Sequence, residues 1–136
     1  MIEMLIVVAI IMVILAIAVP QMLSAKMMAN ELAAVAQIRT INTAQAQYLA
    51  QHNKFAKSLR ELGPELAGLI PDTLSSGVKD GYNYELEESK GGYAIHASPL
   101  NFNGDGRRTF YSDQSLVIRE NWGKDPASPT SPALGH

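Results

Sequence analysis

The chain has 136 residues, a length that suits one domain of ordinary size. Its 11 Lys and Arg against 13 Asp and Glu give a net charge of -2 with His neutral, so no basic excess exists to neutralise the phosphates of a nucleic acid, and no specific nucleic-acid partner is indicated. Cys is absent, which excludes disulfides, thiolate metal sites and cysteine nucleophiles.

The first segment, Met1 to Val19, is apolar apart from Glu3. As a helix it would be roughly 28 Å long, close to the roughly 30 Å core of a bilayer. It therefore predicts a helix that lies in lipid or in an apolar assembly. A cleaved secretory signal is disfavoured, because no Lys or Arg precedes the apolar run and no A-x-A-like site follows it at Pro20 and Gln21. A plain membrane anchor is an alternative that stays open.

Glu3 and Pro20 each add a constraint that an anchor alone does not explain. A buried carboxylate at Glu3 costs several kcal/mol unless a cation pairs with it, although near a helix end it can also extend to the lipid headgroups. No Lys or Arg occurs before Lys26, so we expect the α-amino group of a neighbouring copy to be its partner. Pro20 lacks an N–H, so the helix should kink or lose hydrogen bonds across Ala16 to Val19.

From Gln21 to His52 the helical pattern continues and becomes amphipathic. Apolar residues recur at steps of three or four and predict one buried stripe, made of Leu32, Val35, Ile38, Ile41, Ala44 and Tyr48. Polar residues, Glu31 among them, fill the other faces. One helix that continues to His52 would be about 78 Å long. Because globular helices are shorter, we expect its N-terminal half to contact other chains or lipid.

Residues 53 to 81 are predicted to connect this helix to a sheet. One short helix is placed at Ser58 to Leu69, with its first residue as N-cap and Glu61 completing a capping box. Gly63-Pro64 is expected to break or bend that helix. Gly77 to Gly81 is expected to be a loop.

Four short antiparallel strands are predicted between residues 82 and 120. They are Tyr82 to Glu87, Gly92 to Ala97, Arg108 to Ser112 and Leu116 to Glu120. Alternation of apolar and polar residues and the turn at Lys90-Gly91-Gly92 indicate a meander. A long helix followed by a meander predicts an α+β fold, with the helix packed on a four-stranded antiparallel sheet.

The last segment, residues 121 to 136, contains three Pro among small and polar residues. It is predicted to be an extended, weakly packed tail anchored by Trp122. The chain thus divides into a hydrophobic helix half (1–25), an amphipathic helix half (26–52), a connection (53–81), a sheet (82–120) and a Pro/Ser-rich tail (121–136).

No catalytic constellation and no cofactor site are predicted. His52, His96 and His136 lie far apart in sequence, and no Ser has the context of a nucleophile elbow, so we expect no enzyme activity. Arg107-Arg108 is expected to be a solvated edge or an edge that pairs with another subunit.

One loop carries calcium candidates. Asn101, Asn103 and Asp105 place oxygen ligands at alternate positions, with Gly106 in sixth place, as at the start of a calcium loop. The twelfth position is Ser112 instead of a bidentate Glu. A tight turn explains the same residues, and both explanations stay open.

The N-terminal segment resembles the mature N-terminus of type IV pilins and of type II secretion pseudopilins. The resemblance is carried by Ile2-Glu3-Met4-Leu5-Ile6-Val7-Val8-Ala9-Ile10-Ile11 and by Ala16-Ile17-Ala18-Val19-Pro20, and it covers about the first 25 residues. It is specific because the acidic residue and the proline stand at the family's spacing. In the family a methylated Phe and one further residue precede the position of Met1, and a small Gly stands at the position of Met12.

The resemblance implies the pilin fold and the role of major subunit of a type IV pilus. Each subunit would be processed by a prepilin peptidase, wait in the inner membrane, and be moved by the pilus assembly machinery into an extracellular surface filament of identical subunits. Glu3 would set the axial register, and Pro20 would let the helix extend. The other residues expected to make assembly contacts are Met4, Leu5, Val8, Ile11 and Leu15.

Two alternatives stay open beside the pilus subunit. A type II secretion pseudopilin shares the same N-terminus, and a membrane-anchored extracytoplasmic binding protein would need no polymer. The sequence does not separate adhesion, twitching motility, DNA uptake and secretion, because these depend on exposed loops and on the machinery.

Overall fold

The computed structural model describes residues 1–134, except for the side chains of residues 17–21. Within this part the chain forms three helices and one antiparallel sheet with strand order β1-β2-β3-β4-β5. The elements are α1 (Ile2–His52), α2 (Leu59–Leu62), α3 (Asp72–Ser75), β1 (Val78–Lys79), β2 (Tyr82–Ser89), β3 (Gly92–Pro99), β4 (Arg108–Asp113) and β5 (Arg119–Trp122). The predicted α+β class is confirmed, whereas the predicted number of four strands is wrong.

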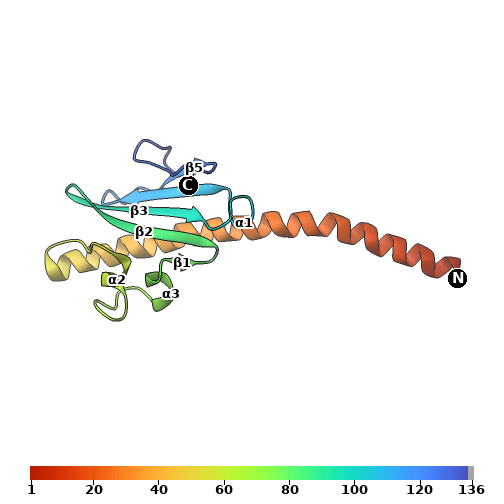
Figure 1. Ribbon diagram of the computed structural model, residues 1–136, viewed down its shortest axis with the longest axis horizontal. Helices are drawn as coiled ribbons and strands as arrows, with labels where there is room; N and C mark the ends of the chain where they lie inside the picture. Colours follow the sequence, from red (N-terminus) through yellow and green to blue (C-terminus); the bar gives the residue numbers. More distant parts are fainter. Residues whose placement is uncertain (135–136) are drawn as a thin grey trace.

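The long helix α1 has two halves with different surroundings. Figure 1 shows its C-terminal half lying along one face of the sheet, while its N-terminal half projects beyond the sheet. We call residues 1–16 the apolar arm and residues 22–134 the head. The helix ends at His52 and is capped by Asn53, which adopts a left-handed conformation (φ 60°) and donates its backbone N–H to the carbonyl of Leu49 at 2.8 Å.

The face that α1 turns to the sheet is close to the predicted stripe. Val35, Ile38, Ile41 and Ala44 are buried against the sheet, and Tyr48 is half-buried. Leu32 is a wrong prediction, because its side chain is 62% exposed. The neighbouring residue Glu31 occupies the facing position instead, and one residue along a helix turns a side chain by about 100°.

The inner face of the sheet supplies the other side of the core. Its largest buried side chains are aromatic and come from β2, β3 and β4: Tyr82, Tyr84, Tyr93 and Phe110. The registers place these residues on the α1 side, since alternate residues of a strand point to one face. The ring centroids of Tyr82 and Phe110 are 5.8 Å apart, so the two side chains pack across β3.

The fifth strand is β1, which lies where a loop was predicted. Val78 pairs with Asn83 and Lys79 with Tyr82 across a two-residue turn at Asp80-Gly81. Both turn residues have positive φ, at 51° and 79°, which is the conformation that a tight antiparallel hairpin requires. The Asp-Gly pair is itself a hairpin signal, and the prediction overlooked it.

The short predicted helix ends earlier than expected, and the last predicted strand begins later than expected. The helix predicted at Ser58 to Leu69 ends at Leu62, because the chain becomes extended at Gly63. Ser58 does cap it, with its hydroxyl accepting the N–H of Glu61 at 3.4 Å. The strand predicted at Leu116 to Glu120 begins only at Arg119, since Leu116 has a left-handed backbone (φ 69°) that a strand does not allow.

The C-terminal segment is packed more closely than predicted. Ala127 is buried against Ala94 and Tyr111 on the outer face of the sheet. Leu134 donates its N–H to the carbonyl of Ile118 at 2.7 Å. Trp122 is not the predicted anchor, because its side chain is 63% exposed. The segment is therefore held by small and aliphatic residues and by backbone hydrogen bonds.

Candidate functional site

The apolar arm is the strongest functional feature of the described chain. Its large apolar side chains from Ile2 to Leu15 are between 49% and 74% exposed. This set includes the predicted assembly residues Met4, Leu5, Val8, Ile11 and Leu15. Exposure is similar on all sides of the helix, so the arm offers an apolar surface all round and no single stripe. A helix of this kind is found buried in a larger assembly or in lipid.

Burial of the apolar arm away from water would be strongly favourable in free energy. Each Val, Leu or Ile side chain that passes from water to a fully buried position contributes about 1.5–3 kcal/mol. Contiguous apolar surface beyond a few hundred Å² is rare on monomeric proteins and marks an interaction site. Among the described residues, no helical stretch is both long enough and apolar enough to cross a membrane.

Glu3 lies in the first turn of α1, where the helix dipole favours a negative charge. Its side chain is exposed, and within the described residues no ion pair involves it. The predicted partner, an α-amino group of a second copy, is not tested by a single chain. Pro20 and most of the kink predicted across Ala16 to Val19 fall on residues 17–21, so those predictions lie outside the described side chains.

A buried polar cluster fixes α1 on the sheet near the middle of the head. The Asn42 amide donates to the Ser112 hydroxyl at 3.0 Å, and its carbonyl oxygen accepts from the Tyr93 hydroxyl at 2.8 Å. Burial raises the pKa of Tyr93 to about 12, so the phenol stays a neutral donor. These bonds define one axial position of α1 on the sheet, because a shift of the helix would leave three buried polar groups unpaired.

Gln45 makes a second fixed contact, between α1 and the connection that follows it. Its amide donates to the carbonyl of Ala56 at 3.0 Å and its carbonyl accepts the Ala56 N–H at 2.8 Å. The sequence reasoning missed Asn42 and Gln45. Their spacing from Ile38 and Ile41 places them on the buried stripe, and this periodicity was the signal that could have found them.

An ionic cluster closes the end of the head nearest the arm. Arg108 contacts the Glu31 carboxylate at 3.4 Å and the Glu120 carboxylate at 2.7 Å. Glu31, only 3% exposed, also accepts the backbone N–H of Arg107 at 3.0 Å. The Arg107 guanidinium donates to the Ser24 hydroxyl at 3.3 Å. Both arginines therefore hold α1 to β4, and the prediction of a solvated or inter-subunit edge is wrong.

The loop with the calcium candidates is closed by its own hydrogen bonds. The Asn101 amide donates to the Asp105 carboxylate at 2.9 Å, and the Asp105 N–H donates to the Asn101 carbonyl at 2.8 Å. Asn103 has a left-handed backbone (φ 66°), as a tight turn requires. Among the described residues no group of three His, Asp or Glu is arranged to hold a metal ion. The contacts favour the turn explanation.

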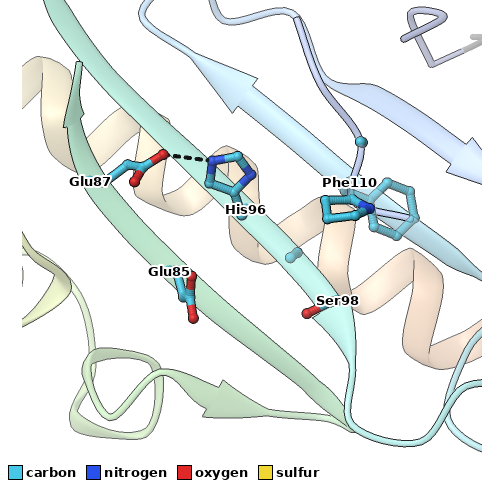
Figure 2. Close-up of a pocket in the computed structure, with 8 residues that line it drawn as sticks. Glu85, Glu87, His96, Ser98 and Phe110 are labelled. Carbon is cyan, nitrogen blue, oxygen red and sulfur yellow. Dashed lines mark hydrogen bonds and ion pairs between the residues drawn. The ribbon is translucent and has the colours of Figure 1, made fainter. Parts of the chain in front are cut away.

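A shallow pocket of about 260 Å³ lies on the outer face of the sheet (Figure 2). His96 faces Glu87 there, with Nε2 and a carboxylate oxygen 2.9 Å apart, and Glu85 and Ser98 line the same pocket. In the described part of the chain, no hydrogen bond joins Ser98 to His96. Among the described residues, the pocket thus holds a contact between His96 and Glu87 and no arrangement in which a base activates a nucleophile.

Comparison of the sequence with models of known protein families and with curated proteins finds no match.

Proposed function

We propose that this chain is the major structural subunit of a helical surface filament, of the kind formed by the type IV pilins that its N-terminus resembles. The observation that carries the proposal is the apolar arm, whose side chains are exposed all round and are not buried by any described segment of their own chain. A bundle of such arms would bury this surface, with the heads forming the outer layer.

The construction of the head supports this role. A subunit that polymerises through its helix must transmit force and position from the arm to the head. The polar cluster at Asn42 and the ionic cluster at Glu31 hold the C-terminal half of α1 at one axial position on the sheet, so a force on this half of the helix reaches the head. A protein that needed only an anchor would not require a fixed helix register.

A filament would also supply the counter-charge that the Glu3 carboxylate needs. A carboxylate inside a bundle of apolar helices needs a cation, and the α-amino group of an adjacent subunit is the nearest one in sequence that a parallel neighbour could bring. Pairing of the two groups would select one axial offset between neighbours. Glu3 therefore acts in this proposal as the residue that sets the register.

The finer parts of the proposal follow from the resemblance. The α+β architecture would be the pilin fold, with five strands in place of the four expected. The subunit would wait in the inner membrane, be processed by a prepilin peptidase, and enter an extracellular filament through the pilus assembly machinery. We propose a structural role and no enzyme activity, since the His96 pocket lacks an activated nucleophile.

The type II secretion pseudopilin is the nearest competing role, because the same arm would serve a short periplasmic filament. A membrane-anchored binding protein is the competing role outside this family. Electron microscopy of material sheared from the cell surface separates the three. Long fibres that contain this chain support the pilus subunit. Dependence of protein export on the gene, without fibres, supports the pseudopilin, and protein that stays monomeric in detergent supports the anchored binder.

A further inference from the structure

Trp122 is the only tryptophan of the chain, and it lies on the surface of the head. It is the last residue of β5, and its side chain is 63% exposed. Large aromatic side chains of this kind are enriched in the contacts that carry most of the energy of protein interfaces. A single exposed tryptophan therefore marks a place where a partner would gain much apolar contact.

The Trp122 side chain is held in place by its neighbours. The Arg108 guanidinium lies over the indole ring, 4.7 Å from its centroid. Arg108 is itself fixed between the carboxylates of Glu31 and Glu120. The ring is thus stacked on a cation that is already neutralised, while most of the Trp122 surface stays exposed. Little conformational entropy remains to be lost when a partner binds to a side chain held this way.

Trp122 lies at the end of the head from which the apolar arm emerges. In the strand register it is opposite Arg108, which contacts Glu31, and the adjacent Arg107 contacts Ser24. Through Arg108, these contacts place Trp122 near Glu31 of α1. The exposed side chains of Leu23 and Met28 lie at this same level of the helix.

We infer that Trp122 is the docking point on each head for the apolar arm of a second copy of this chain. The inference rests on the proposed filament and names one contact within it. The apolar arm and the exposed Trp122 ring are different surfaces of the same molecule. A contact between two different patches of identical subunits is heterologous, and a heterologous contact that does not close into a ring propagates as an open helix.

The arm and the Trp122 ring can meet without burying an unpaired charge. The arm carries no charge between Met4 and Leu15, so it brings no group that must be neutralised at the indole. The charges beneath Trp122 are already paired, so covering the ring leaves no new buried ion. The middle of the arm, near Val8, is about 20 residues from Met28, which corresponds to an axial offset of about 30 Å between the two copies.

The lone tryptophan provides a direct test by fluorescence. The intact chain is compared as detergent-solubilised monomer and as assembled filament, with acrylamide as the quencher. We expect the emission to shift to shorter wavelength in the filament and the quenching constant to fall by about threefold or more, because the centre of an interface excludes solvent. Filaments in which Trp122 is quenched as strongly as in the monomer would overturn the inference and leave the proposed function standing. A chain that forms no filament under any condition would count against the proposed function itself.

A matched pair of variants tests the energetic role. Trp122→Ala should reduce filament yield about tenfold, as expected for loss of a central interface contact. Leu66→Ala is the control, because Leu66 is equally exposed (64%) and lies on the connection after α2. Both monomers should keep the melting temperature of the parent head, which separates an assembly defect from unfolding. Normal yield from Trp122→Ala would contradict the inference.

Cysteine cross-linking tests the identity of the occupant, since the natural chain has no Cys. Lys124→Cys, beside Trp122, is combined in turn with a Cys at each position from 4 to 15. At least one combination should give a ladder of cross-linked subunits on oxidation, and Lys124→Cys alone should not. If filaments form normally and no combination links, or if Lys124→Cys links to itself, the arm is not the occupant.

Discussion

The Tyr93 hydroxyl donates a 2.8 Å hydrogen bond to Oδ1 of Asn42, and this contact joins β3 to α1 inside the core. The Asn42 amide continues the chain of bonds to Ser112 on β4. The side chain of this one helix residue therefore makes hydrogen bonds to two strands. The axial position of α1 depends on this residue more than on any of the aliphatic side chains around it, since those could repack at a shifted register.

Asn42→Ala should destabilise the head by about 2–4 kcal/mol, because the buried hydroxyls of Tyr93 and Ser112 would lose their partner. Chemical denaturation of the intact chain in detergent measures the loss. Thr40→Ala is the control, since Thr40 is exposed and bonds only the Ala36 carbonyl of its own helix, and it should change stability by less than about 0.5 kcal/mol. Equal stability of the two variants would show that the polar cluster does not fix the helix.

Glu31→Gln should cost about 2–3 kcal/mol. The substitution keeps the size of the side chain but removes the charge that faces Arg108 in a buried setting, while Glu120 remains as a second partner. Glu65→Gln breaks the exposed pair with Arg60 at 3.8 Å and serves as the control, with an expected change below about 0.5 kcal/mol. A difference between the two variants smaller than the error of denaturation would contradict the assignment of Glu31 to the core.

Glu3→Ala should abolish or strongly reduce filament formation while leaving the melting temperature of the head unchanged. The reason is that a neighbouring subunit would present its terminal amine to a position with no counter-charge. Glu65→Ala is the control, because it removes a carboxylate of the head whose side chain is 78% exposed, and it should assemble normally. Filament yield in sheared material is the measurement. Abundant filaments from Glu3→Ala would remove the register role of this carboxylate.

The stability of the head should fall in alkaline solution. Burial raises the pKa of Tyr93 from 10.0 to about 12, so the folded state favours the neutral phenol. This contribution is fully present below pH 10 and is lost as pH rises through about 12, because the unfolded chain releases its proton first. Tyr93→Phe should flatten the decline between pH 10 and 12, although burial also raises the pKa values of Tyr82 and Tyr84. Unfolding free energies measured across this range give the two slopes, and identical slopes would contradict the prediction.

Gly81→Ala should destabilise more than Gly91→Ala. Both glycines have left-handed φ, at 79° and 80°, so both substitutions carry the same backbone strain. A Cβ at Gly81 would also lie 2.9 Å from the Asn30 amide nitrogen and 3.0 Å from Asp105 Cβ, whereas nothing lies within 4 Å at Gly91. The added clash breaks the Asn30 contact to the Asp105 carbonyl, and we expect an extra loss of about 1 kcal/mol. Thermal unfolding of both variants measures the difference.

Much of the fold was predictable because it depends on local patterns. The three-to-four spacing of Val35, Ile38 and Ile41 gave the packed face of α1, and the alternation in β2 and β3 gave the hairpin. Strand β1 was not predicted, because the turn signal at Asp80-Gly81 was overlooked. Leu116 was predicted to lie in a strand because strand propensity takes no account of the left-handed backbone that the preceding turn imposes.

The interior polar contacts were harder to predict. Glu31 looks like a surface residue until Arg108, 77 positions later, is brought beside it by the sheet. Periodicity marks a position as buried, but only the tertiary arrangement shows which partner makes the burial of a charge tolerable. The exposure of Trp122 was hard to predict for the same reason, because it depends on where β5 ends in the folded sheet. The arm, in contrast, was evident from composition alone.

The pairing of Arg119 with Ala133 at the margin of β5 limits how this protein can aggregate. The Glu120 N–H donates to the Pro132 carbonyl at 3.0 Å, so the final residues occupy backbone groups that a foreign strand would otherwise recruit. At the opposite margin β1 has only two residues and pairs with Tyr82 and Asn83 alone, so most of the β2 edge has no strand of the described chain beside it. A foreign strand would therefore be recruited at the β2 border of the head and not at the β5 border.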